Sequence, residues 1–148
     1  MQFSGSAELS PDGNLNVYTN SLWEPTSTVV SGTVDIEGLW GFTVTGNITF
    51  QGSSTYVDWI SPSGTDGIGE AGDLYDSNGY VYINGGASVV VNVVGGGEVD
   101  PGLTWTLIST TSAVGIQPGN FGNPNLPEFT QEINPNNPTG EQYWQMAS

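Results

Sequence analysis

The sequence predicts an all-β fold, most simply an antiparallel sandwich or jelly roll, with a β-solenoid as the alternative. Three observations support this prediction. Apolar and polar residues alternate with period two in many short segments, no helical periodicity of useful length is present, and 22 glycines mark turns between the segments. About eight or nine strands are expected on this pattern.

The expected strands follow from the alternation in chain order. Residues 3–9 alternate up to a turn signal at 10–14, and residues 15–18 form the return strand. The segment 20–26 is predicted as a loop in which Trp23 covers the core. Further strands are predicted over residues 30–37, 42–50, 54–60, 80–83, 87–94 and 103–108.

Two of these strands have distinctive faces, and a turn between two others predicts how they pair. Residues 42–50 alternate most regularly, with a Thr/Asn face that we expect to be solvated. The triplet 84–86, Asn-Gly-Gly, tolerates the positive φ of a tight hairpin, so residues 80–83 and 87–94 are expected to pair antiparallel. Strand 54–60 places on one face Tyr56, Asp58 and Ile60.

Charge is the most unusual property of the chain. Its 148 residues include 15 Asp and Glu but no Lys, Arg or His, which gives a formal net charge of −15. Ordinary usage would supply about 18 Lys and Arg in a chain of this length. Because no ion pair between side chains can form, solvent cations, bound metal or a basic partner must balance the carboxylates. No trypsin-type cleavage site remains either.

The same composition excludes several classes of function. Phosphate recognition draws on Lys and Arg, so we expect neither nucleic acid nor an anionic membrane surface as a partner. Without His, Cys or Lys there is no Ser-His-Asp triad, ordinary zinc site or P-loop. A glycosidase-type carboxylate pair is the catalytic chemistry that remains, and we expect a protein that is not an enzyme. No apolar run approaches the ~20 residues of a membrane span.

The most acidic stretch of the chain predicts a calcium site. Clustered carboxylates on a glycine-rich backbone supply the hard oxygen ligands that Ca²⁺ prefers, although the spacing does not match an EF-hand loop. A plain solvated loop is the alternative. The expected ligands are Asp66, Glu70, Asp73, Asp76 and Asn78.

The composition changes at Gln117, so we predict a β domain over residues 1–116 and a Pro/Asn-rich C-terminal arm over residues 117–148. The arm carries large apolar side chains that a disordered linker would not need. We expect the arm to contact a neighbouring subunit by adding a strand to an exposed sheet edge, or alternatively to fold back onto its own domain. The expected contact residues are Phe129, Ile133, Tyr143, Trp144 and Met146.

Several short motifs occur in a fixed order between about residue 30 and residue 122. They are Gly46-Asn47-Ile48-Thr49-Phe50, Leu74-Tyr75-Asp76, Gly85-Gly86-Ala87 and Asp100-Pro101-Gly102 followed by Leu103-Thr104-Trp105-Thr106-Leu107. This order resembles a β-rich module of bacterial surface proteins of the autotransporter and adhesin type. The resemblance implies a surface scaffold without catalytic residues.

These observations predict a structural subunit of an extracellular or cell-surface assembly, such as a filament, matrix or coat, that self-associates through its arm. A virion decoration or fibre protein is the first alternative, because no signal peptide is visible after Met1. A carbohydrate-binding module is the second alternative. Its glycan would stack on Tyr80 and Tyr82, or on Trp23, Trp40 or Trp59.

Overall fold

The fold consists of β-strands arranged in parallel sheets. The computed structural model describes residues 6–9, 13–18, 21–38, 41–62, 74–76, 79–99, 105, 107–110, 116–117 and 123–125. Within these ranges all elements of regular secondary structure are strands, which confirms the all-β prediction. All strand pairs between them are parallel, so the predicted antiparallel sandwich or jelly roll is wrong.

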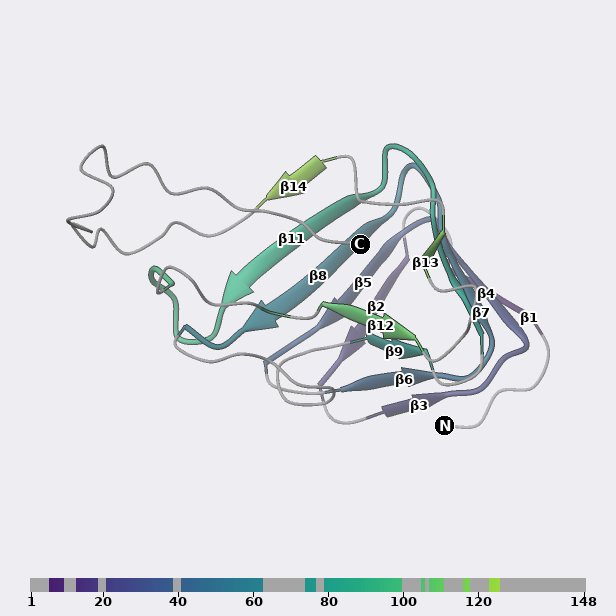
Figure 1. The fold of residues 1–148 in the computed structure, drawn as a ribbon, viewed down its shortest axis with the longest axis horizontal. Coiled ribbons are helices and arrows are strands. Elements are labelled where there is room, and N and C mark those ends of the chain that lie inside the picture. Colours follow the sequence, from purple (N-terminus) through teal and green to yellow (C-terminus); the bar gives the residue numbers. More distant parts are fainter. Residues whose placement is uncertain are drawn as a thin grey trace.

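The chain visits three sheets in turn, and Figure 1 shows them as the three walls of a triangle. Sheet A contains β1 (Ser6–Leu9), β4 (Ser27–Val30), β7 (Asn47–Phe50), β10 (Val81–Ile83) and β13 (Ile116–Gln117). Sheet B contains β2 (Asn14–Val17), β5 (Thr33–Ile36), β8 (Thr55–Ile60), β11 (Ser88–Val93) and β14 (Asn123–Asn125). Sheet C contains β3 (Ser21–Trp23), β6 (Phe42–Val44), β9 (Leu74–Asp76) and β12 (Ile108–Thr110).

One strand from each sheet makes a coil, and the coils stack in the manner of a β-solenoid. The first coil contains β1 to β3, the second β4 to β6, the third β7 to β9 and the fourth β10 to β12, while β13 and β14 extend sheets A and B into the segment predicted as the arm. Each strand pairs with the strand at the same position one coil away. The crossover that a parallel pair requires is therefore the rest of the coil.

The coils differ in length although their strands keep register. Ser6 pairs with Ser27 and Ser27 with Asn47, so the first two coils take 21 and 20 residues. Val81 pairs with Ile48 and then with Ile116, which makes the later coils 33 and 35 residues long. The long connections run from β8 to β9 and from β11 to β12, so both leave sheet B and enter sheet C.

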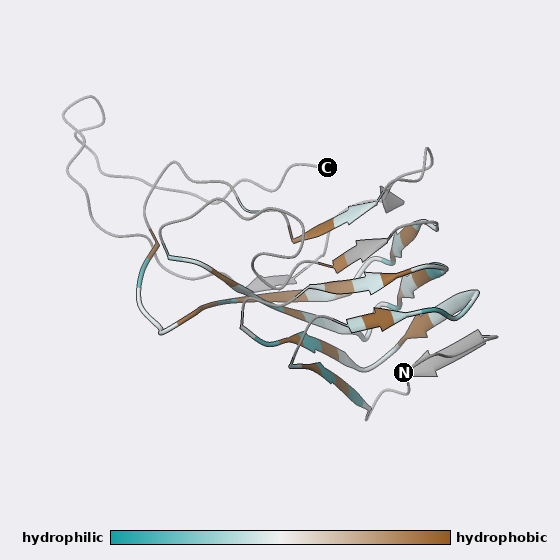
Figure 2. Ribbon diagram, turned by 90° about the horizontal axis from the view of Figure 1, so that it is seen from below, coloured by the Kyte–Doolittle hydropathy of each residue, from teal (hydrophilic) through white to brown (hydrophobic). Residues whose placement is uncertain are grey.

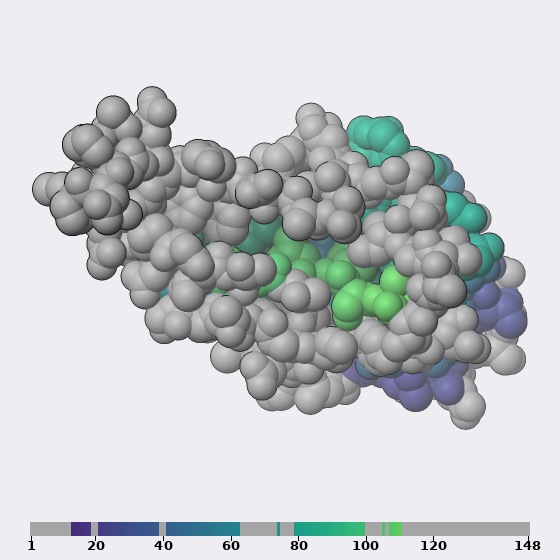
Figure 3. Space-filling view, viewed as in Figure 1, coloured from purple at the N-terminus to yellow at the C-terminus, as the bar shows by residue number. Residues whose placement is uncertain are grey.

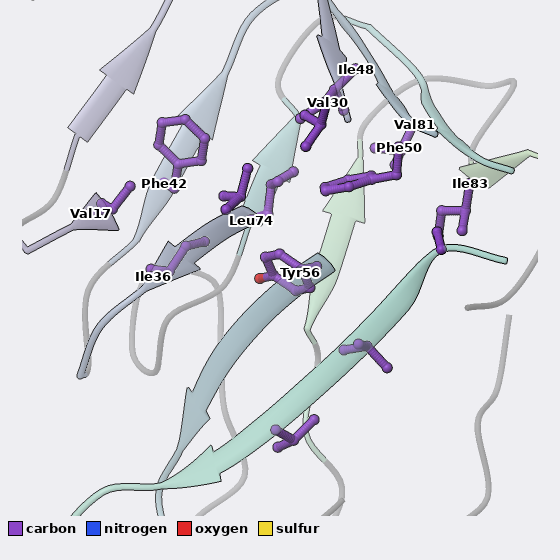
Figure 4. Packing of buried hydrophobic residues seen from close by; sticks show 14 of the residues in the cluster. Val17, Val30, Ile36, Phe42, Ile48, Phe50, Tyr56, Leu74, Val81 and Ile83 are labelled. Atoms are coloured by element: carbon purple, nitrogen blue, oxygen red, sulfur yellow. The ribbon is translucent and has the colours of Figure 1, made fainter. Parts of the chain in front are cut away.

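The core lies between the three sheets. In β4 to β8 and in β10 and β11 every second residue points inward and is buried, and Figure 2 shows the corresponding alternation of hydropathy along the ribbons. Side chains of the same parity stack in columns across neighbouring coils, such as Val30, Phe50 and Ile83 in sheet A. Figure 4 shows side chains from all three sheets converging, with the ring of Phe50 edge-on to that of Tyr56 at a centroid distance of 5.8 Å.

The alternation was predicted correctly, but the strand boundaries were not. The predicted strand 30–37 is divided between β4 and β5 by a corner at Ser31 and Gly32, and 42–50 is divided between β6 and β7. The inward and outward parity continues through these corners without a break. For this reason two short strands in different sheets have the same sequence pattern as one long strand.

Three further predictions are corrected. The proposed hairpin 80–94 is absent, because β10 and β11 belong to different sheets and the Gly86 region forms a corner between them. The segment 20–26 is not a loop throughout, since it contains β3. The last predicted strand, 103–108, begins only at Ile108, with residues 103, 104 and 106 outside the described residues.

One corner requires glycine because neighbouring coils touch there through their backbones. A Cβ on Gly46 would overlap the carbonyl oxygen of Pro25 and lie 2.5 Å from that of Thr26. A Cβ on Gly79, at the same corner one coil further, would lie 2.5 Å from the carbonyl oxygen of Gly46. The backbone can approach this closely only where no side chain intervenes.

Candidate functional site

Of the predicted calcium ligands, three fall between β8 and β9, whereas Asp76 ends β9 and Asn78 follows it. Asp66, Glu70, Asp73 and Asn78 lie outside the described residues, and for Asp76 the structure describes only its place at the end of β9, where it pairs with Val44 and Thr110. Among the residues that the structure does describe, no group of three acidic side chains could hold a metal ion. The calcium site therefore stays a prediction.

The predicted subunit contacts also lie outside the described residues, all of them in the segment after Asn125: Phe129, Ile133, Tyr143, Trp144 and Met146. Two large apolar side chains that were not predicted as contacts are exposed on the first coil. Tyr18, next to β2, is 57% exposed, and Leu22, in β3, is 47% exposed. In the described part of the chain, β2 is the last strand of sheet B and β3 is the last strand of sheet C.

The outer face of sheet B carries aromatic and acidic side chains. Asn16 donates from Nδ2 to the Tyr18 hydroxyl at 3.0 Å. One coil further along, Asp35 Oδ1 accepts a hydrogen bond of 3.1 Å from Trp59 Nε1, whose ring is half-buried. This bond fixes the indole against β5. The face therefore presents one rigid aromatic ring and, at the first coil, an exposed one.

The outer face of sheet A carries the tyrosine pair that the sequence suggested for glycan stacking. The rings of Tyr80 and Tyr82 meet edge to face, with centroids 4.7 Å apart and an interplanar angle of 82°. A side-chain hydrogen bond with Tyr80 raises the pKa of the Tyr82 phenol, and desolvation and the nearby Tyr80 charge act in the same direction. Next to this pair Asn84 Nδ2 donates to Gln51 Oε1 at 2.9 Å across the coils.

Trp23 covers the core, as predicted. Its ring packs against the core cluster, and its Nε1 donates to the buried hydroxyl of Thr28 at 2.8 Å. This bond satisfies a polar group that would otherwise be costly to bury. Trp40 lies outside the described residues.

A polar cluster inside the core was not predicted as a site. Asp58, in β8, is fully buried, and its Oδ2 lies 3.0 Å from the Tyr56 hydroxyl. The same hydroxyl lies 2.9 Å from the carbonyl oxygen of Leu107, and the Trp59 amide donates to Asp58 Oδ1 at 2.8 Å. The sequence contained one indication of this cluster, because Asp58 alternates in step with Tyr56 and Ile60 and therefore lies on the buried face of its strand.

The segment before β12 is attached to the third coil by side chains. Besides the contact of Tyr56 with Leu107, Trp105 Nε1 donates to the Ser61 carbonyl at 3.0 Å. Figure 3 shows the described residues between positions 105 and 110, which include β12, in green in the middle of the face in view. Both contacts join residues more than forty positions apart in the chain.

Comparison with known proteins identifies no relative: no family model, no curated protein and no solved structure matches this chain. Within the described residues there is no helix long and apolar enough to cross a membrane. The resemblance to adhesin-type surface modules accordingly stays a prediction.

Proposed function

We propose that the protein is a structural subunit of an extracellular or cell-surface assembly, such as a filament, matrix or coat. The observation that carries this proposal is the first coil. There β2 and β3 are the last strands of their sheets in the described part of the chain, and two large apolar side chains are exposed beside them, Tyr18 and Leu22. A strand that is added at the end of a sheet gains main-chain hydrogen bonds and contacts with the side chains there, which makes this coil the proposed acceptor for an added strand.

The C-terminal arm of a second copy is the proposed donor. In an extended conformation residues 129–133 would place Phe129 and Ile133 on one side, and Pro127 and Pro135 would limit the length of such a segment. Such a segment adds main-chain hydrogen bonds at an edge and apolar contacts to Leu22 and its neighbours. Tyr143, Trp144 and Met146 would extend the contact.

The charge of the chain sets the condition for assembly. Each copy carries 15 acidic side chains and no basic one, so two copies repel each other at low ionic strength. Assembly is therefore expected in the presence of divalent cations or salt. A virion decoration or fibre protein would use the same edge, and a signal peptide upstream in the gene would favour the cell surface instead.

The test compares the full chain with a chain ending at Leu126, which keeps β14, by light scattering over a range of concentrations in Ca²⁺ and in NaCl. We expect the full chain to form larger species and the shortened chain to stay monomeric. A full chain that is monomeric under all these conditions contradicts the proposal. Equal masses with a less stable shortened chain would mean that the arm belongs to its own domain.

A pair of substitutions tests the edge itself. Leu22→Asp places a charge on the edge strand, whereas Thr43→Asp places the same charge on the residue that pairs with it one coil further in. Only Leu22→Asp is expected to abolish assembly. Equal effects of the two substitutions would show that added charge, and not the edge, is responsible.

Binding of a neutral polysaccharide is the second candidate function, and the outer face of sheet B favours it. Continuing the β2–β5 and β5–β8 registers by one and two residues places Tyr18, Glu37 and Trp59 in one column. The two aromatic residues are then about 10 Å apart, two strand spacings, with carboxylates between them to accept hydroxyl groups. Retarded migration of the protein in gels containing a soluble glucan, lost in Tyr18→Ala but not in Tyr82→Ala, would support this candidate.

A further inference from the structure

Asp58 occupies a position that the fold otherwise gives to aliphatic side chains. In sheet B it pairs with Val91 on one side, and continuing the β5–β8 register places Ile36 at its level on the other. Its side chain is fully buried. Burying an ionised carboxylate costs several kcal/mol unless a cation pairs with it, and this chain has no Lys, Arg or His to do so.

The hydrogen-bond distances indicate how many protons this cluster holds. A phenol has one proton, yet the Tyr56 oxygen lies within hydrogen-bond distance of both Asp58 Oδ2 and the Leu107 carbonyl oxygen. A peptide carbonyl only accepts, and so does an ionised carboxylate. With Asp58 ionised, the single Tyr56 proton would have to be shared between two acceptors, so that neither contact is a full hydrogen bond.

A protonated Asp58 resolves this geometry. Its Oδ2–H donates to the Tyr56 oxygen, and the Tyr56 proton is then donated to Leu107. Asp58 Oδ1 still accepts from the Trp59 amide, as the carbonyl oxygen of a carboxylic acid does. The Leu107 carbonyl also accepts from the Leu74 amide at 3.1 Å, at the point where β12 joins β9.

We propose that Asp58 holds a proton in the folded protein at neutral pH, and that the relay from Asp58 through Tyr56 to Leu107 is a pH-sensitive attachment of the fourth coil to the third. Loss of the proton leaves the relay one hydrogen short, and the segment leading into β12 loosens. Among the described residues, Tyr56 is the titratable group that faces Asp58, since Ile36 and Val91 flank it and Asp35 and Glu37 lie on the outer face of sheet B.

The direction of the pH effect follows from proton linkage. An unfolded chain releases the Asp proton above about pH 4, whereas the folded chain keeps it. Unfolding at neutral pH therefore releases one proton, so stability falls as the pH rises until the folded protein also loses it. Each pH unit in this window raises the unfolding equilibrium constant tenfold, about 1.4 kcal/mol.

The first test uses the full chain labelled with ¹³C at the aspartate carboxyl groups, followed by NMR from about pH 4 to about pH 9. One carboxyl resonance is expected to stay at its protonated position at pH 7 and to be absent from Asp58→Asn. If every resonance has titrated below neutral pH, or if the protonated one remains in Asp58→Asn, the proposal is overturned. Should Asp58→Asn not fold, Tyr56→Phe assigns the resonance, because removing the hydroxyl must shift it, and an unshifted resonance also overturns the proposal.

The second test measures chemical denaturation as a function of pH. Asp58→Asn keeps the shape of the side chain and a donor to Tyr56 but has no proton to release. The tenfold rise of the unfolding equilibrium constant per pH unit that Asp58 contributes in the wild type should therefore be missing from this variant. Asp35→Asn is the matched control, since this side chain lies on the outer face of the same sheet and keeps an acceptor for Trp59. Equal pH slopes for the wild type and Asp58→Asn would refute the relay.

Discussion

Replacing Gly46 by alanine tests whether close backbone contact between coils stabilises this fold. The new methyl group would overlap the carbonyl oxygen of Pro25 and lie 2.5 Å from that of Thr26. Both are backbone atoms and cannot rotate away. The Thr26 carbonyl also accepts the Asn47 amide at 3.2 Å, so moving the coils apart would weaken that hydrogen bond as well.

The expected loss of stability combines these two effects. Overpacking of a tight site costs about 1–3 kcal/mol, and a weakened backbone hydrogen bond adds about 1 kcal/mol. The smaller entropy of unfolded alanine offsets about 0.4–1 kcal/mol. A net destabilisation of about 2 kcal/mol is expected, which corresponds to a decrease in Tm on the order of 5–10 °C.

Chemical denaturation followed by circular dichroism measures this loss. Gly85→Ala is the matched control, because Gly85 lies at another corner, has a φ outside the positive range and has no atom within 4 Å of the place that a Cβ would take. This control should change stability by less than about 1 kcal/mol. If both substitutions have equal effects, the contact at Gly46 does not hold the coils in register.

Two other predictions concern ions and protons. Ca²⁺ is expected to raise Tm more than NaCl at matched ionic strength, because a site built from Asp66, Glu70, Asp73, Asp76 and Asn78 would add binding free energy to general screening; equal shifts would rule out that site. In an alkaline titration followed by tyrosinate absorbance, Tyr82 should ionise above the usual pKa of a phenol, and Tyr80→Phe should lower that pKa because it removes the hydrogen-bond partner. A pKa of Tyr82 that is unchanged in Tyr80→Phe, once the absorbance lost with Tyr80 is subtracted, would contradict this assignment.

The sequence was sufficient to predict which residues face the core. In segments such as 42–50 the buried and half-buried residues alternate as expected, because the parity of a β-strand does not depend on its neighbours. The direction of pairing could not be predicted in the same way. A two-residue corner such as Ser31-Gly32 preserves the parity, so a strand that turns into a second sheet has the alternation of a straight strand.

Some of the candidate functional residues could be identified from the sequence, whereas others depend on how the coils stack. Asp58 could have been identified from sequence, since it shares its parity with Tyr56 and Ile60, two residues expected in a core. The contact with Leu107 could not, because it joins positions 51 residues apart and depends on how the coils stack. The exposure of Leu22 likewise depends on β3 being the last strand of sheet C in the described part of the chain, which local sequence does not reveal.

The unequal coil lengths define a place where this scaffold can display added sequence. Both long connections begin at paired residues, Ile60 and Val93, and end at paired residues, Leu74 and Ile108. Their ends are thus about 4.8 Å apart, one strand spacing, while the sheets on either side keep their register. Because each coil contacts only its neighbours, a peptide grafted at this corner would leave the frame unchanged, and peptides in successive coils would be presented as a closely spaced row.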